Sequence, residues 1–266
     1  MKAGTTQKKF FKIANRFLIY FYFLINMQRY TKAGILIATL VVPALIFLFL
    51  KFFGQNHYIL PRFIPLIDST TNEPVLRSIV DPITKKTIQD TVFRTIPPFS
   101  FIDQNNQTFS QEKTKGKIYV ANFIFSRCGL ICPKVTNQLA RVQDAFLKND
   151  DVLFVSHTVD PLYDTPKVLK EYAQKNDAID GRWFFVTGDK GSIYKQALKG
   201  YFVPISDASA YNKAITNPDE AFIHSEKMIL VDKEGVIRGF YDGTDSKEVD
   251  RLMVEVKVLL DIYSKK

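Results

Sequence analysis

Apolar runs alternate with polar segments along the C-terminal two thirds of the chain, and their lengths predict alternating strands and helices. Nearly continuous apolar runs at residues 117–125, 151–159 and 182–188 predict strands that are buried on both faces. Apolar residues at helical spacing follow the first run. A second helix is predicted after the next run, with Thr165 as its N-cap and Pro166 in its first turn. The order is therefore strand, helix, strand, helix, strand.

The last part of the chain predicts a hairpin and a final helix. Residues 227–232 and 236–242 flank Lys-Glu-Gly, a sequence typical of a turn between two strands. Asp245 can cap a helix whose later apolar residues lie on one face. Strands and helices in this order, followed by a hairpin and a helix, predict an α/β, thioredoxin-like fold. We assign residues 96–264 to it.

The N-terminal part has a different pattern. Residues 33–50 carry no charge, and Lys51 with two phenylalanines can extend this run, so we predict a single transmembrane helix at residues 33–53. A cleaved signal peptide and a buried core helix are the alternatives. Residues 54–95 contain four prolines, and we expect a tether that includes one hairpin.

Charged residues are distributed unevenly along the chain, and this changes what the net charge indicates. The formal net charge is +9, but residues 1–32 hold seven of the 36 basic side chains and no acidic ones. The remaining 29 basic residues face 27 acidic ones, so the predicted domain is nearly neutral and nucleic acid is not an expected partner. The basic flank predicts a cytoplasmic N-terminus by the positive-inside rule. We therefore expect a single-pass protein of the inner membrane with its C-terminal domain in the periplasm.

Cys128 and Cys132 are the two cysteines of the chain, and both fall on the loop between the first predicted strand and its helix. Pro133 suits the first turn of that helix. A helix N-terminus favours a thiolate and lowers its pKa, so the position favours chemistry over packing. Two buried structural thiols, or a permanent disulfide closing a short loop, are the structural alternatives. The spacing C-x-x-x-C is one residue longer than the C-x-x-C of thioredoxin-type oxidoreductases, and it admits either a metal ion or a reversible disulfide.

Histidines and aspartates supply the other candidates. His224 precedes the predicted hairpin, which in a thioredoxin-like fold enters beside the cysteine loop. Two thiolates and an imidazole would make a soft site that suits copper, as Cu(I) or Cu(II). His157 is predicted to be a hydrogen-bonded histidine at a strand end. Asp160 and Asp164 are explained by turn formation and helix capping.

Four segments together resemble the Sco/SenC family of membrane-anchored, thioredoxin-like copper proteins that serve cytochrome c oxidase assembly. The segments are PPFSFIDQNNQTF, KGKIYVANFIFSRCGLICP, VDPLYDTPKVLKEYA and IHSEKMILVDKEGVIRGFYDG, in the family's order within residues 96–243. The resemblance implies Cys128, Cys132 and His224 as copper ligands, a redox-active cysteine pair, and a copper-accepting oxidase subunit as partner. It implies a metallochaperone rather than an enzyme with turnover.

Two positions depart from the family pattern. Arg127 stands where relatives often have histidine, and its charge is expected to support the thiolate of Cys128. Ile223 stands where relatives often have aspartate, which removes a possible partner of His224. The alternative function is a thiol–disulfide oxidoreductase or thiol peroxidase on the same fold. A copper-responsive redox sensor would use the same residues as the chaperone.

Overall fold

In the computed structural model, the chain forms two compact units, Met1–Tyr58 and Ile59–Lys266. The residues that the structure describes are 29–53, 60–80, 85–208, 214, 217, 222–223 and 225–265.

In the first unit, the described residues form one helix, α2 (Arg29–Phe53), which contains Pro43. Within it, Gly34–Phe52 is long and apolar enough to cross a membrane, and none of it is buried by other residues. Exposed apolar side chains such as Leu40 and Phe47 would be unfavourable in water, whereas a bilayer would cover them. The helix agrees with the predicted apolar span at residues 33–53.

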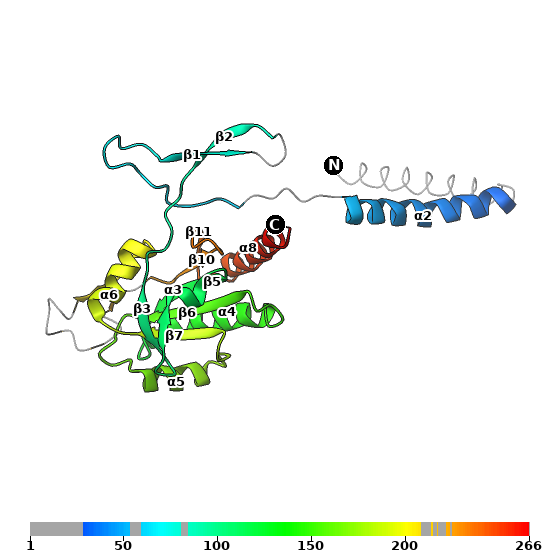
Figure 1. The fold of residues 1–266 in the computed structure, drawn as a ribbon. Helices are drawn as coiled ribbons and strands as arrows, with labels where there is room; N and C mark the ends of the chain where they lie inside the picture. The colour runs from blue at the N-terminus through cyan, green and yellow to red at the C-terminus, as the bar shows by residue number, and fades with distance from the viewer. Residues whose placement is uncertain are drawn as a thin grey trace, which may run out of the picture. The chain divides into compact units, whose positions relative to one another are not determined.

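The second unit is built on a seven-stranded sheet with the order β11-β10-β5-β6-β7-β3-β4 (Figure 1). β5, β6 and β7 are parallel, and β3 and β10 pair antiparallel at either side of them. All three predicted core strands and the C-terminal hairpin are confirmed. The strands are β3 (Ser100–Asp103), β4 (Thr108–Ser110), β5 (Ile118–Ile124), β6 (Val152–Thr158), β7 (Trp183–Thr187), β10 (Lys227–Val231) and β11 (Ile237–Asp242).

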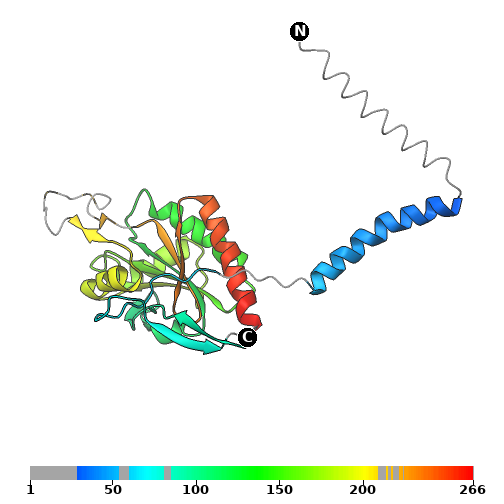
Figure 2. The same cartoon turned by 90° about the horizontal axis from the view of Figure 1, so that it is seen from above.

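Helices cover both faces of this sheet. They are α3 (Gln111–Thr114), α4 (Cys132–Ala145), α5 (Pro166–Lys175), α6 (Lys190–Lys195), the π-helical turn η1 (Gln196–Gly200) and α8 (Ser246–Ser264). Thr165 caps α5 and Asp245 caps α8 through side-chain hydrogen bonds, as predicted. α8 packs beside α4 (Figure 2), and Thr136 of α4 is hydrogen-bonded to Tyr172 of α5, so these helices share one layer.

The carboxyl ends of β5 and β6 lead into α4 and α5, so both helix N-termini lie at the same edge of the sheet. Side chains alternate between the two faces along each strand. Ser156 points toward the α4 and α5 layer, where Trp183 donates to its hydroxyl group. Phe123 and His157, paired side by side in β5 and β6, point to the opposite face, where they contact Tyr201 after η1.

Two small sheets flank the main one. The predicted hairpin before the domain is present as β1 (Leu76–Val80) and β2 (Thr87–Thr91), and β8 (Ser206–Asp207) pairs with β9 (Phe222–Ile223). The segment before the hairpin is fixed to the main sheet: Leu60 is buried, and Arg238 of β11 donates to the carbonyl groups of Leu60 and Pro61.

Candidate metal centre

The structure brings the two cysteine side chains together at the start of α4. Cys128 lies on the turn after β5, where its N–H donates to the carbonyl of Phe125 at 3.1 Å, and Cys132 is the first residue of α4. The N–H of Cys132 donates to the sulfur of Cys128 at 3.3 Å. Ile131 at the N-cap position offers no side-chain acceptor, so this sulfur satisfies one of the N–H groups that a helix start leaves without a partner.

The electrostatics differ from the expectation for a helix N-terminus. Cys128 is 8% exposed and Cys132 is 1% exposed, and both are present as thiols. The side-chain hydrogen bond to Cys128 and burial raise the pKa of the Cys132 thiol far above its usual range. The predicted lowering of the pKa is therefore wrong for Cys132, because these effects outweigh the helix terminus. A bound metal ion would reverse this preference for the protonated thiol, since a coordinating thiol is deprotonated by the metal.

A buried carboxylate fixes the turn that carries Cys128. Asp164 is fully buried, and it accepts hydrogen bonds from the N–H of Ser126 at 3.1 Å, from the hydroxyl of Ser126, and from the hydroxyl of Thr158. The turn predicted at Asp160–Asp164 is present. The predicted capping role of Asp164 is wrong, however, because Thr165 caps α5 and the Asp164 carboxylate connects β5 to β6 instead.

Arg127 lies next to the cysteine site, where its charge is paired with a carboxylate. Its guanidinium group forms an ion pair with the buried carboxylate of Asp160 and lies 4.2 Å from the ring centre of Tyr163. Sequence reasoning found Arg127 as a departure but not this pairing, which joins two loops far apart in the chain. The effect of Arg127 on Cys128 stays a prediction, and its charge is shared with Asp160.

Tyr172 of α5 is a residue near the two cysteines that sequence reasoning missed. Its hydroxyl lies 3.0 Å from the hydroxyl of Thr136, and burial raises the pKa of Tyr172 to about 12, with smaller contributions from Cys132 and Cys128. Ser126 and Thr158 were missed as well. Small polar residues at strand ends are common, and their shared acceptor becomes evident only when the strands are paired.

His157 is placed away from the cysteines, on the opposite face of the sheet. Its ring is fully buried among aromatic rings, and among the described residues neither ring nitrogen has a hydrogen-bond partner. The backbone carbonyl groups of Asn122 and Val155 favour the protonated ring, although neither forms a hydrogen bond with it. Burial outweighs this effect and lowers the pKa of His157 to about 4. The prediction of a hydrogen-bonded histidine is wrong.

His224 lies outside the described residues. The nearby Phe222 is described, and its ring centre lies 5.1 Å from that of Phe125, three residues before Cys128. Among the described residues, no group of three or more His, Cys, Asp and Glu side chains could hold a metal ion. The described part of the site therefore supplies two sulfur donors, a set that fits a soft ion such as Cu(I).

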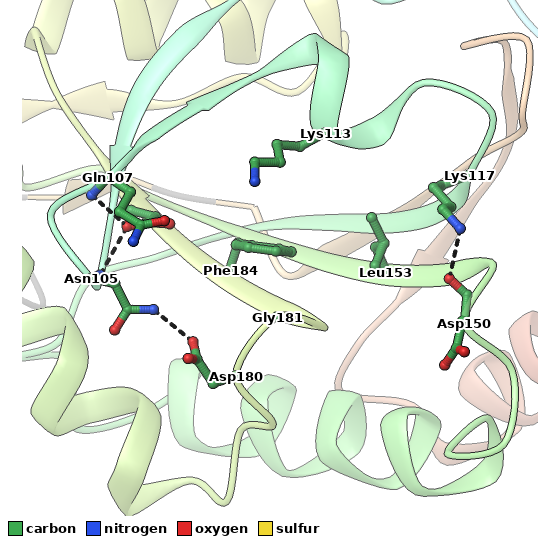
Figure 3. Close-up of a pocket in the computed structure, with 10 residues that line it drawn as sticks. Asn105, Gln107, Lys113, Lys117, Asp150, Leu153, Asp180, Gly181 and Phe184 are labelled. Atoms are coloured by element: carbon green, nitrogen blue, oxygen red, sulfur yellow. Dashed lines mark hydrogen bonds between the residues drawn. The ribbon is translucent and has the colours of Figure 1, made fainter.

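A separate cavity of about 640 Å³ lies at the amino ends of the parallel strands (Figure 3). Its lining includes Lys113 and Lys117, and Asn105 donates to Asp180 at 2.6 Å across one side. Its floor includes the apolar side chain of Phe184. Its described lining contains neither cysteine nor histidine, so this cavity is not part of the cysteine site.

Comparison with known proteins places this thioredoxin-like domain in a family. The SCO1/SenC family model matches residues 88–259. A SCO1 protein homolog of Bacillus subtilis is 31% identical over 175 residues, which cover 64% of this chain and 85% of the relative. The chain belongs to the SCO1/SenC family.

Solved structures of similar proteins support the same family. BsSco, described as a member of the Sco family of cytochrome c oxidase assembly proteins with a disulfide switch, is 29% identical with a TM-score of 0.54; the match covers 62% of this chain and 92% of BsSco. Yeast Sco1 with copper bound is 27% identical with a TM-score of 0.50, over 61% of this chain and 88% of the yeast chain.

Proposed function

We propose that this protein is a membrane-anchored copper chaperone that holds one copper ion through Cys128, Cys132 and His224 and assists maturation of the copper centre of cytochrome c oxidase. The observation that carries the proposal is the contact between the two cysteines at the start of α4, where the N–H of Cys132 donates to the sulfur of Cys128. Copper-bound Sco1 of yeast, a structural relative, supports the choice of metal.

Each proposed ligand has a distinct role. The two sulfurs would favour Cu(I), and an imidazole would help to hold Cu(II). The packing of Phe222 on Phe125 supports His224 as the third ligand, because two residues of extended chain span at most about 7 Å. His157 is not available as a substitute, because it is fully buried on the other face of the sheet.

Burial shields the two cysteines from water, since Cys128 and Cys132 are 8% and 1% exposed. Copper held there would pass to a partner that offers soft donors of its own. The proposed partner is a copper-accepting subunit of the oxidase. The apolar helix α2 would anchor the chain in the inner membrane, with the basic N-terminus in the cytoplasm and the domain in the periplasm.

Competitive copper titration of the full chain in detergent tests the proposal. Cys128→Ser and Cys132→Ser should each abolish stable Cu(I) binding, because one thiolate and one imidazole hold it poorly. His224→Ala should keep Cu(I) and lose Cu(II). The matched control His157→Phe, at a buried histidine, should change neither Cu(I) nor Cu(II) binding. If His224→Ala holds Cu(II) as tightly as the wild type, the three-ligand site is wrong and the thiol–disulfide oxidoreductase takes its place.

A further inference from the structure

The fully buried carboxylate of Asp164 is connected to the cysteine loop more closely than its position in the sequence suggests. It follows Cys128 by a helix and a strand, yet it accepts two hydrogen bonds from Ser126, one from the N–H at 3.1 Å and one from the hydroxyl group. A third comes from Thr158 at the end of β6. Hydrogen bonds to a charged acceptor are about twice as strong as neutral ones, so this cluster is a firm connection between the two loops.

The connection acts on the short segment that determines where Cys128 lies. Ser126 is two positions before Cys128, and the turn between them is closed by the hydrogen bond from Cys128 N–H to the Phe125 carbonyl. Cys132 is fixed independently as the first residue of α4. The relative position of the two sulfurs therefore depends on how well the turn at Ser126 is held.

We propose that Asp164 is a positioning residue that holds Cys128 against Cys132 and thereby lowers the reduction potential of the pair. This inference rests on the redox-active cysteine pair that the family resemblance implies, and it does not require copper. The carboxylate acts through its hydrogen bonds to Ser126 and Thr158, which hold the sulfurs at close approach and so favour the disulfide over the dithiol.

The relevant reaction is exchange with glutathione. Reduction breaks the Cys128–Cys132 bond, and two glutathione molecules supply two electrons as they join in a disulfide of their own. Their two thiol protons end on the two cysteine sulfurs. The equilibrium constant of this exchange measures the reduction potential, and a tenfold change corresponds to about 30 mV.

Two substitutions at Asp164 weaken these hydrogen bonds to different degrees. Asp164→Asn keeps an oxygen that can accept from Ser126 but makes the acceptor neutral, so its hydrogen bonds are weaker, and we expect the disulfide to become about threefold easier to reduce. Asp164→Ala removes the acceptor altogether, and we expect at least a tenfold change, or about 30 mV. Ser126→Ala removes one hydrogen bond and keeps the charged acceptor, and should give a smaller change in the same direction.

The measurement uses the full, copper-free chain in detergent, equilibrated in glutathione buffers, with the disulfide fraction read by mass spectrometry after alkylation. The matched control is Asp103→Asn. Asp103 is also a buried carboxylate that accepts backbone hydrogen bonds, from Asn105 and Gln107, but it lines the distant cavity of Figure 3. It should leave the potential within a factor of two of the wild type.

Three results would decide the matter. A graded rise in potential from Ser126→Ala to Asp164→Ala, with no change in the Asp103 control, supports the inference. Wild-type potential in both Asp164 variants overturns it, even if their thermal stability falls, and leaves the copper proposal untouched. If the wild type forms no Cys128–Cys132 disulfide at all, the inference fails together with the redox-active pair that the resemblance implies, and the copper proposal is tested separately by the titration.

Discussion

The buried histidine on the far face of the sheet leads to a quantitative prediction about acid stability. His157 is enclosed by the rings of Phe99, Phe101, Phe123 and Tyr201, all neutral at moderate pH. Burial lowers the pKa of His157 to about 4 in the folded protein, against about 6.5 in the unfolded chain. Because the folded state binds the proton less well, stability is full above pH 6.5 and falls as the pH drops toward 4.

The magnitude follows from the two pKa values. Between pH 7 and pH 4.5, the preference of the unfolded state for the proton costs about 2 kcal/mol of folding free energy. His157→Phe keeps a ring among the aromatic side chains and removes the titrating group. The free energy of unfolding of this variant should therefore be less sensitive to acid than that of the wild type, by the same amount. Carboxylates that titrate in the same range affect both proteins equally.

The assay is urea unfolding of both proteins at several pH values, followed by the fluorescence of Trp183. This is the single tryptophan of the chain, and it is fully buried in the domain, so its emission reports unfolding of the domain alone. Equal loss of stability in wild type and His157→Phe on acidification would contradict this prediction. It would mean that the folded protein admits the charged imidazole, by rearrangement or by entry of water.

Other predictions address the anchor, the cysteine pair and the domain core. A reporter that is active only outside the cytoplasm, fused after Lys266, should be active; signal from a cytoplasm-specific reporter at the same site would contradict the proposed orientation. Mass spectrometry of the air-oxidised protein should find a Cys128–Cys132 bridge, and copper uptake should require its reduction; equal uptake by the oxidised form would argue against thiolate ligation. Arg238→Met should lower the free energy of unfolding by roughly 3–5 kcal/mol in urea, because it leaves the buried carboxylate of Asp232 without its partner; a change below about 1 kcal/mol would show that the pair is unimportant.

Much of the fold could be predicted from the sequence because its signals are local. Continuous apolar runs indicated the three parallel strands, and capping residues such as Thr165 and Asp245 indicated the helix starts. The small sheet of β8 and β9 was not predicted. Each of its strands has only two residues, which is too short for any periodic pattern, and residues 208–221 separate the two strands.

The site was predictable only in part. The cysteines stand out because of their spacing and their place after a core strand, and the family match covers them. Asp164 and Arg127 could not be interpreted from the sequence, since their partners lie on another strand end, far away along the chain. The sign of the pKa shift at Cys132 was also beyond sequence reasoning, because it depends on burial and on the contact with Cys128.

X-ray absorption spectroscopy of the copper-loaded protein shows directly whether Cys128, Cys132 and His224 together hold copper. Reduced full-length protein is loaded with one equivalent of copper, and the wild type is compared with His224→Ala. We expect two sulfur scatterers in both proteins and an imidazole contribution in the Cu(II) wild type that disappears in the variant. Fewer than two sulfur scatterers in the wild type, or an imidazole signal that survives in His224→Ala, would contradict the three-ligand site.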